Sequence, residues 1–430
     1  MTFSAQTSAN QTQDYLDEKF EKRRKGVYGP PVGKKLVIFV DDLNMPKKEE
    51  YGAQPPLELL RQFLDHGGWY DRKSKEKPFL RIEDITFVAA MGPPGGGRAV
   101  VTGRLQRHFN IMTYTDLQAE SIDTIFSTIL AAFYAGFATE IKEAVTPLIA
   151  MTLRVYDAVL TGPLKPTPSR SHYTFNLRDI SRIAQGLCSA DRRECAQPAQ
   201  LVRLWVHENQ RVFGDRLIDE TDRGWLGKTL ADEGLATFSL EREAVYNAER
   251  LVFGDYMDGI DVETRVYRQV SDLKVLVSKV DEYLEDYNSS VKVQMHLVMF
   301  LDACDHVSRI ARVLRQPLGN ALLLGVGGSG RQSLARLATF IANYKLFQVE
   351  VVKGYGMSNW RDDAKRALLQ AGVENKQTSF LFVDTQIVHE QMLEDINNIL
   401  NSGDVPGLYK TEDLEPIFKV GKLLCMEKNL

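Results

Sequence analysis

The sequence predicts an α/β fold in which a mostly parallel sheet is covered by helices on both faces, together with a separate helical region. Three observations predict it. Short aliphatic runs such as "LVIFV", residues 36–40, have the length and composition of buried parallel strands. Segments with apolar residues at helical spacing accompany these runs, and they dominate from about residue 118 to 235. In addition, one strand–loop–helix pattern occurs twice.

The first part of the chain is expected to hold three strands and a charged helix. "ITFVAAM", residues 85–91, is a second strand candidate, and "FNIMTY", residues 109–114, is a third. "DYLDEKFEKRRK", residues 14–25, has opposite charges at i,i+4 spacing and predicts a helix, with residues 26–35 forming a turn.

The remainder alternates between helices and strands. Asn176 is the expected N-cap of a helix beginning "LRDISRI". The predicted helices span residues 121–138, 148–160, 176–188, 197–216, 266–288 and 294–315, and the further strand candidates are residues 321–326, 346–352 and 379–383.

Composition excludes several classes of function. The net charge of −4 and pI near 6.1 give no reason to expect a nucleic acid or an anionic membrane as partner. The four cysteines show no C-x-x-C spacing, which favours free thiols over a metal site or disulfides. The most apolar segment, residues 124–138, is shorter than the ~20 residues that cross a bilayer, so we expect a buried helix and a soluble protein.

The stretch "LLLGVGGSGRQSL", residues 322–334, runs from an apolar strand candidate through a glycine turn into a predicted helix. Its glycines allow positive φ angles and let backbone N–H groups converge on a phosphate at a helix N-terminus. A tight turn without a ligand is the alternative, but the flanking strand and helix favour binding of ATP or ADP. The candidate residues are Gly325, Gly327, Gly328, Ser329, Gly330, Arg331, Gln332, Ser333 and, 59 residues after Gly325, Asp384.

The repeated pattern lies at residues 36–71 and 380–409. Each copy has an apolar strand that ends in an aspartate, Asp41 or Asp384, followed by a polar loop and an amphipathic helix. In phosphate-loop nucleotidases such an Asp helps to hold Mg²⁺, and the following residue, commonly Glu, polarises the attacking water. We therefore expect indirect contacts of Mg²⁺ with Asp384 and Asp41.

The spacing within the repeat indicates two incomplete modules. A glycine loop 59 residues before Asp41 would precede Met1, and Gly92 lies 51 residues after Asp41, a distance that in the second copy reaches beyond Leu430. The chain is therefore expected to contain the back half of one nucleotide-binding module and the front half of the next.

Longer motifs resemble the AAA+ modules of axonemal dynein heavy chains. "SAQTSANQTQD", "GPPVGKKLVIFVDDLNMP" and "AAMGPPGGG" are similar to the third module of that family, and "GVGGSGRQSLARLA" and "FLFVDTQI" to the fourth. The resemblance covers the chain up to about Asp413, after which "LEPIFKVGKLLCMEKNL" departs from the expected pattern. It implies a phosphate-loop AAA+ fold with a helical lid, within a ring that powers a microtubule motor of cilia and flagella.

The resemblance also implies boundaries, partners and a location. Residues 1–117 would be the C-terminal part of the third module's α/β subdomain, 118–235 the helical lid, and 236–430 the N-terminal part of the fourth module. The partners would be other AAA+ modules of the same heavy chain, with dynein intermediate and light chains and microtubules bound through parts of the parent protein outside this sequence. The location would be the cytoplasm and cytoskeleton, in the axoneme of the cilium or flagellum.

The glycine loop departs from the consensus G-x-x-x-x-G-K-[ST]. Arg331 keeps a positive charge, but its planar fork does not reach phosphates as a lysine does. Gln332 removes the hydroxyl that would ligate Mg²⁺, and Ser333 lies about 100° further round the helix. Thr385 stands where a carboxylate would polarise water, and loss of such a group costs ~10²–10⁴ in rate. We expect nucleotide binding with slow or no hydrolysis, in a regulatory or structural role.

At the first strand end, Asp42 occupies the usual Glu position and is a weak catalytic candidate, because its own phosphate loop lies outside the sequence. The resemblance puts Gly92 where related proteins carry a polar sensor side chain. Arg104 and Arg107, in "VVTGRLQRHFN" where the family has "PVTPRFLRHFN", are either arginine fingers for a neighbouring nucleotide or plain surface residues. Arg178 is either a lid arginine that contacts phosphate or a participant in a helix-dipole or ion-pair interaction.

Three further interpretations of the sequence are a zinc site, a scaffold without nucleotide and an independent hydrolytic enzyme. His207-Glu208 and His389-Glu390 do not continue to a second His at the metalloprotease spacing, so a zinc site is excluded. A non-enzymatic AAA+-like scaffold that binds no nucleotide is the alternative to nucleotide binding. An independent hydrolytic enzyme is disfavoured, since neither module is complete, and the chain alone is not expected to be an efficient ATPase.

Overall fold

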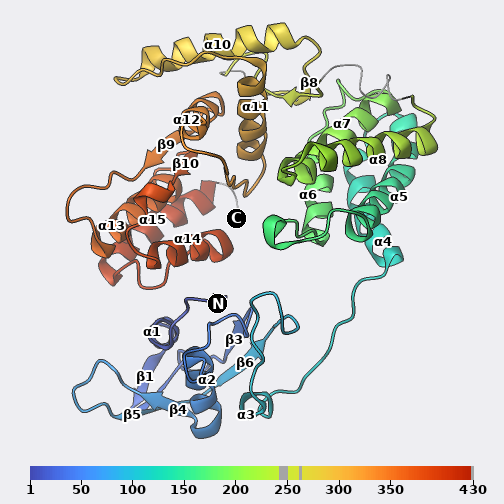
Figure 1. Ribbon diagram of the computed structural model, residues 1–430. Helices are drawn as coiled ribbons and strands as arrows, with labels where there is room; N and C mark the ends of the chain where they lie inside the picture. The colour runs from blue at the N-terminus through green and yellow to red at the C-terminus, as the bar shows by residue number, and fades with distance from the viewer. Residues whose placement is uncertain (242–249, 261–263, 428–430) are drawn as a thin grey trace. The chain divides into compact units, whose positions relative to one another are not determined.

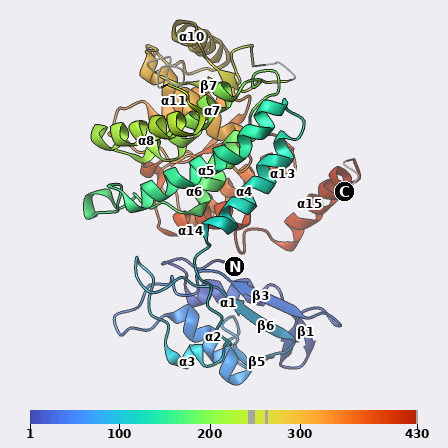
Figure 2. The same cartoon turned by 90° about the vertical axis from the view of Figure 1, so that its right-hand side faces the viewer.

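The computed structural model describes residues 1–241, 250–260 and 264–427, drawn in Figures 1 and 2. These residues form two compact units. The first comprises residues 1–114, 348–376 and 382–430, and the second comprises residues 115–347 and 377–381.

The N-terminal part of the first unit is an α/β structure. A four-stranded sheet has the order β1-β2-β5-β4, and a second sheet pairs β3 with β6 in parallel. The Ser8 side chain caps α1 through a capping box with Gln11. The elements are α1 (Ala9–Asp17), β1 (Glu21–Arg24), β2 (Val27–Gly29), β3 (Leu36–Val40), α2 (Pro55–His66), β4 (Gly68–Tyr70), β5 (Phe79–Ile82), β6 (Ile85–Ala89) and α3 (Gly103–Gln106).

Strand β3 places the first strand-end aspartates. It runs alongside β6 in register from Leu36 opposite Ile85 to Val40 opposite Ala89 (Figure 1). Ile38 and Val40 are buried in the core beneath it, whereas Val37 and Phe39 are exposed on the other face. The predicted strand is thus confirmed, but only one of its faces is covered by the described residues.

The C-terminal part of the first unit contains the second copy of the repeat. It consists of α13 (Met357–Gly372), the 3-10 helix η3 (Asp384–Gln386), α14 (Gln391–Ser402) and α15 (Thr411–Glu427). Helices α2 and α14 are the equivalent helices of the two copies. Both end at a left-handed glycine with φ 72°, Gly67 and Gly403, a conformation that glycine adopts without steric cost.

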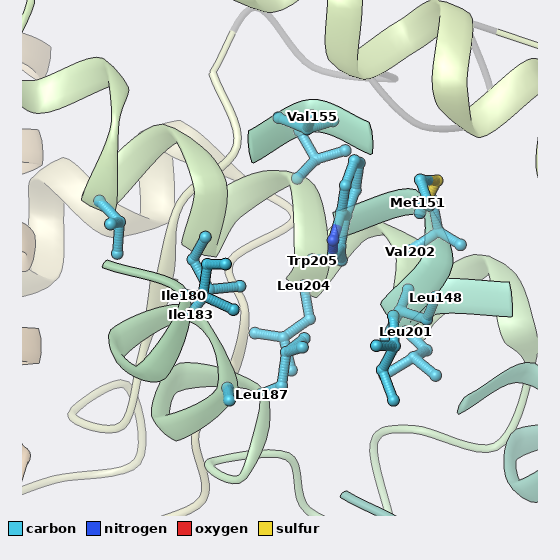
Figure 3. Packing of buried hydrophobic residues seen from close by; sticks show 14 of the residues in the cluster. Leu148, Met151, Val155, Ile180, Ile183, Leu187, Leu201, Val202, Leu204 and Trp205 are labelled. Atoms are coloured by element: carbon cyan, nitrogen blue, oxygen red, sulfur yellow. The ribbon is translucent and has the colours of Figure 1, made fainter. Parts of the chain in front are cut away.

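The second unit begins with the helical region that the sequence predicts. Leu148, Met151 and Val155 of α5 pack against Leu201, Val202 and Trp205 of α7, with residues of α6 alongside (Figure 3). The Trp205 indole N–H donates to Thr152 Oγ1 at 2.7 Å, so this fully buried donor has a hydrogen-bond partner. The elements are α4 (Ala119–Tyr134), α5 (Thr139–Thr161), η1 (Pro168–Arg170), α6 (Leu177–Leu187), α7 (Pro198–Val212), η2 (Gly214–Arg216) and α8 (Glu220–Phe238).

Helix α5 has the length and apolar composition of a membrane span, the only helix of the described residues that does. Its apolar side belongs to the core of the helical region, as Leu148, Met151 and Val155 show. Packing within the second unit therefore explains the apolar composition of α5.

The rest of the second unit carries the glycine loop. Helices α11 and α12 pack together in one core with α10, and β9 and β10 form a two-stranded sheet. The elements are β7 (Phe253–Gly254), β8 (Arg268–Gln269), α10 (Leu273–Ser290), α11 (Leu301–Arg315), α12 (Arg331–Ile341), β9 (Lys345–Gln348, whose last residue is assigned to the first unit) and β10 (Thr378–Leu381).

The predicted helix over residues 14–25 is wrong in its second half. The helix ends at Asp17, and residues 21–24 form β1, which pairs antiparallel with β2. Gly26, at φ 74°, reverses the chain between the two strands, and Arg23 donates to the carbonyl of Pro30. Strand pairing therefore outweighs the i,i+4 charge pattern here.

Two predicted strands are also wrong. Residues 109–114 and 321–326 form no strand, and no other strand of the described chain pairs with them. Leu322, Leu324 and Val326 are consequently exposed, at 84%, 75% and 79%. A β-strand needs a neighbour to take up its backbone hydrogen bonds, and composition alone does not supply one.

Two predicted helices begin later than expected. The helix predicted from residue 266 begins at Leu273, because the Asp272 side chain accepts from the backbone N–H groups of Lys274 and Val275 and caps it. The helix predicted from residue 294 begins at Leu301.

Candidate functional site

The glycine loop turns directly into helix α12. Gly328 and Gly330 have φ angles of 81° and 75°, and Gly330 is the N-cap residue. The first intrahelical bond runs from Leu334 N–H to the Gly330 carbonyl, at 2.9 Å. The N–H groups of the first turn therefore point out of the helix end without intrahelical partners, which is the arrangement that binds phosphate.

The side chains of the loop lie over its first glycine. A Cβ atom added to Gly325 would lie 3.1 Å from Ser329 Oγ, a tight contact, and 3.4 Å from Arg331 Cδ, an ordinary one. Arg331 is half-buried and forms no ion pair with any residue that the structure describes. Its charge is thus available to an anionic ligand at the helix N-terminus.

The two residues after Arg331 differ in exposure. Gln332 is exposed and Ser333 is half-buried, while Leu334 and Leu337 are buried in the core shared with α11. Helix α12 is therefore fixed by its apolar side, and the side chains of residues 331 and 332 lie outside that core.

Asp384 follows β10 and opens the 3-10 helix η3. Its side chain and that of Thr385 are exposed. Gln386 holds the turn, because its Oε1 accepts from Val383 N–H at 2.9 Å and its Nε2 donates to the Val349 carbonyl at 2.5 Å. Asp384 belongs to the first unit and the glycine loop to the second.

Asp41 and Asp42 lie at the carboxyl end of β3. Asp42 has φ 52°, and its N–H donates to Asp41 Oδ1 at 3.0 Å. Arg98 Nη2 lies 3.5 Å from Asp42 Oδ1. In the chain as described, the candidate water-polarising carboxylate therefore has a guanidinium as its neighbour, which the sequence did not predict.

Asn44 ties the end of β3 to the glycine turn. It is fully buried, and its Nδ2 donates to the Gly92 carbonyl at 2.8 Å. A Cβ atom on Gly92 would lie 2.8 Å from Arg98 Nε, so the absence of a side chain at position 92 lets Arg98 pass. Sequence reasoning assigned no role to Asn44 or Arg98, although Asn44 lies within the family motif "GPPVGKKLVIFVDDLNMP".

The two finger candidates lie in different surroundings. Arg107 donates to Asp65 of α2 at 2.5 Å and lowers the pKa of that carboxyl, with help from Arg61 and His108. Arg104 is exposed in the first turn of α3 and has no ion-pair partner in the described part of the chain. Arg107 therefore has a structural role within this chain, and Arg104 remains the freer candidate.

Arg178 lies in the first turn of α6. Asn176 is confirmed as the N-cap, accepting from the Arg178 N–H at 2.9 Å, while the Arg178 side chain is exposed and unpaired within residues 1–241, 250–260 and 264–427. A cation at a helix N-terminus is disfavoured by the helix dipole. The dipole interpretation therefore gains no support, and contact with an anion remains the prediction.

Metal binding by protein side chains alone is not supported. No group of three or more His, Cys, Asp or Glu side chains among the described residues is placed to hold a metal ion. His207 is buried, with Nδ1 3.0 Å from the Leu251 carbonyl, and burial lowers its pKa well below the ordinary value. Mg²⁺ that accompanies a nucleotide takes only one or two carboxylates besides phosphate oxygens and water, and the exposed Asp384 and Asp41 fit that mode.

Three family models match the chain. Residues 1–117 match the P-loop containing dynein motor region, and residues 295–429 match the P-loop containing dynein motor region D4. Residues 148–240, which contain α6 to α8, match the AAA+ lid domain. The second match extends past Asp413, so the expected departure of the last residues from the family pattern is not supported.

Curated relatives are similar over the same region. "Dynein axonemal heavy chain 1" of Homo sapiens is 49% identical over 443 residues, which cover 100% of this chain and 10% of the relative. "Dynein axonemal heavy chain 3" of Mus musculus is 46% identical over 426 residues, covering 96% of this chain and 10% of the relative. The chain belongs to the axonemal dynein heavy chains, with P-loop AAA+ modules and an AAA+ lid, and spans about a tenth of the length of these relatives.

Proposed function

We propose that this chain binds ATP or ADP at the glycine loop, with slow or no hydrolysis, and that the bound nucleotide serves a regulatory or structural role in a dynein motor ring. The observation that carries the proposal is the N-terminus of α12, where left-handed Gly328 and Gly330 lead into an open first turn beside the unpaired Arg331.

Slow turnover follows from the residues at the strand end. Thr385 offers no carboxylate to polarise a water molecule, and Gln332 offers no hydroxyl to Mg²⁺. The contacts with Mg²⁺ would come from Asp384 for this loop, and from Asp41 for the site at the end of β3. The residues of the chain would then hold and orient the phosphates without activating water.

The whole protein is proposed to be an ATP-powered microtubule motor of the cilium or flagellum. The support is the family and the names of its relatives. Within that protein we place residues 1–117 and 118–235 in the third AAA+ module and its lid, and residues 236–430 in the fourth module. Other modules of the ring are the immediate partners of these segments.

Nucleotide titration of the purified chain tests the proposal. ATP and ADP are added with and without Mg²⁺, and the midpoint of thermal unfolding is followed. A ligand that binds only the folded chain stabilises it by about 2.7 kcal/mol at a hundredfold excess over Kd. Arg331→Ala is expected to weaken this effect, whereas Lys274→Ala, an exposed substitution in the first turn of α10, is the matched control.

A flat titration at millimolar nucleotide would favour the competing function, an AAA+-like scaffold without a nucleotide. Saturable stabilisation that is equal in Arg331→Ala and in the unmodified chain would move the binding site away from the glycine loop.

A further inference from the structure

A buried ion pair joins helix α7 of the lid to helix α11. Glu208 is fully buried, and Arg312 Nε lies 3.1 Å from each of its carboxylate oxygens. The Tyr267 hydroxyl donates to the same carboxylate, at 3.3 Å from Oε1. Burial opposes the charge on Arg312, but Glu208 outweighs burial and raises the pKa of Arg312. Both side chains are buried, so neither has bulk water as an alternative partner.

A second set of charges extends the same interface. Arg309 of α11 lies 2.5 Å from Asp305 and 3.2 Å from Asp215, which belongs to η2 of the lid. Arg211 of α7 lies 3.4 Å from Asp215 and 3.5 Å from Asp305. Acidic and basic groups thus alternate between the lid and α11, so separating the two would leave buried charges on both sides.

The lid is shaped around the carboxylate. A Cβ atom on Gly186 of α6 would lie only 1.8 Å from Glu208 Oε2. Gly186 is the last residue but one of α6, and its missing side chain leaves the space that Glu208 needs when it points toward Arg312.

Helix α11 is packed against the helix that carries the loop. Val307 and Ile310 of α11 lie in one buried core with Leu337 and Ile341 of α12, and α12 begins at Arg331 of the glycine loop. A displacement of α12 is therefore passed to α11 by direct packing, and from α11 to α7 by the Glu208–Arg312 pair.

We propose that Glu208 and Arg312 are positioning residues that fasten the lid to the helices bearing the glycine loop, so that the lid responds to a nucleotide at that loop. The fastening stands on the contacts within the second unit, and the response to nucleotide rests on the function proposed above. The two parts have separate tests.

The fastening is tested without nucleotide by hydrogen–deuterium exchange of the complete 430-residue chain. In the unmodified chain, the amides of α7 and α11 are expected to exchange through the same opening reaction, with the same equilibrium constant for opening. Glu208→Gln leaves Arg312 buried without a counter-ion, and exchange in both helices should accelerate on the order of 10²–10³-fold. Glu233→Gln, which breaks the exposed pair with Arg154, is the matched control and should change neither. Acceleration confined to one of the two helices would overturn the proposal.

Two further variants keep the test decisive if Glu208→Gln does not fold. Gly186→Ala should accelerate exchange in α6 and α7, because the new methyl group meets the Glu208 carboxylate. In a chain that already carries Glu208→Ala, Gly186→Ala should accelerate exchange much less, because that carboxylate is absent. Glu208→Met with Arg312→Met should restore slow exchange, because an apolar pair of similar volume replaces the ion pair. Additive effects of Gly186→Ala and Glu208→Ala would contradict the geometry.

The response to nucleotide is read from the same peptides after addition of ADP. Protection of residues 325–334 reports binding at the loop, and protection of α6 and α7 reports the response of the lid. Protection at the loop alone would refute the response while leaving the proposed function intact. If ADP protects both the loop and the lid in the unmodified chain, Glu208→Met with Arg312→Met should keep the protection of the loop and change the protection of α6 and α7. No protection at the loop would refute the proposed function, and the fastening would still stand on the exchange without nucleotide.

Discussion

Restoring the consensus phosphate loop should strengthen nucleotide binding and increase its dependence on Mg²⁺. Arg331→Lys with Gln332→Ser turns "GVGGSGRQ" into the motif G-x-x-x-x-G-K-[ST]. Gln332 is exposed and Arg331 forms no ion pair with a described residue, so the exchange disturbs little packing. The main gain is one hydroxyl ligand for Mg²⁺ and one slim ammonium for the phosphates.

The size of the effect follows from the strength of charge-assisted contacts. A hydrogen bond to a charged group contributes about 1.5–3 kcal/mol, which corresponds to roughly ten- to a hundredfold in Kd. Isothermal titration calorimetry with ATP, with and without Mg²⁺, measures it directly. The double variant should bind more tightly by this factor in Mg²⁺ and should gain less without it, because the new hydroxyl then has no metal ion to contact.

Ser333→Ala provides the control for the position of the hydroxyl. Ser333 lies about 100° further round α12 than Gln332 and should contribute nothing to magnesium dependence. Equal Kd values for the double variant and the unmodified chain in Mg²⁺ would refute the reasoning, as would a magnesium effect in the unmodified chain that Ser333→Ala abolishes.

Three further predictions concern the folded chain. Asn176→Ala removes the capping box of α6 and should lower the free energy of unfolding of the lid, measured in urea, by ~0.5–2 kcal/mol. Asn176→Asp keeps a capping side chain and should retain most of the stability of the unmodified lid. Equal losses in both variants would exclude the cap as the cause. Trp205→Ala empties a fully buried site and should cost about 3–5 kcal/mol, against no measurable change for the exposed Tyr51→Ala; a cost below 1 kcal/mol would mean that the core collapses around the gap. Burial is the main cause of the raised pKa of Asp395, so the folded chain binds that proton more tightly than the unfolded chain. The free energy of unfolding should therefore fall as pH rises above the ordinary value of 3.8 toward the folded pKa, and Asp395→Asn should remove that part of the slope; an unchanged slope would locate the proton elsewhere.

The elements that the sequence predicts well are those with local causes. Strands β3 and β6 follow from continuous apolar runs, and α2 and α14 from helical periodicity that stops at a left-handed glycine. Asn176 was found as a cap because its side chain acts on N–H groups two and three residues away.

The elements that it misses depend on distant partners. Residues 321–326 are as apolar as β3, yet they pair with no strand of the described chain and stay exposed. The same holds for the candidate sites. Arg107 is engaged by Asp65, and Asp42 by Arg98, in contacts between residues 42 and 56 positions apart that no local pattern announces.

The Glu208–Arg312 pair shows most clearly that local sequence patterns do not predict contacts between distant residues. Its partners are 104 residues apart. In the sequence, Glu208 belongs only to a His-Glu pair that lacks the second His of a zinc motif, and Arg312 belongs to no motif. Only the ion pair between α7 and α11 gives either residue a role.

The missing side chain at Gly186 fixes the register of the lid helices. Glu208 occupies the volume that any larger residue would need. If α6 slipped by one residue along α7, Gln185 or Leu187 would arrive at the carboxylate and collide with it. The Glu208 carboxylate therefore opposes sliding of α6 along α7, because it fills the space beside Gly186. The relative position of α6 and α7 is thus set by steric complementarity between a glycine on one helix and a carboxylate on the other.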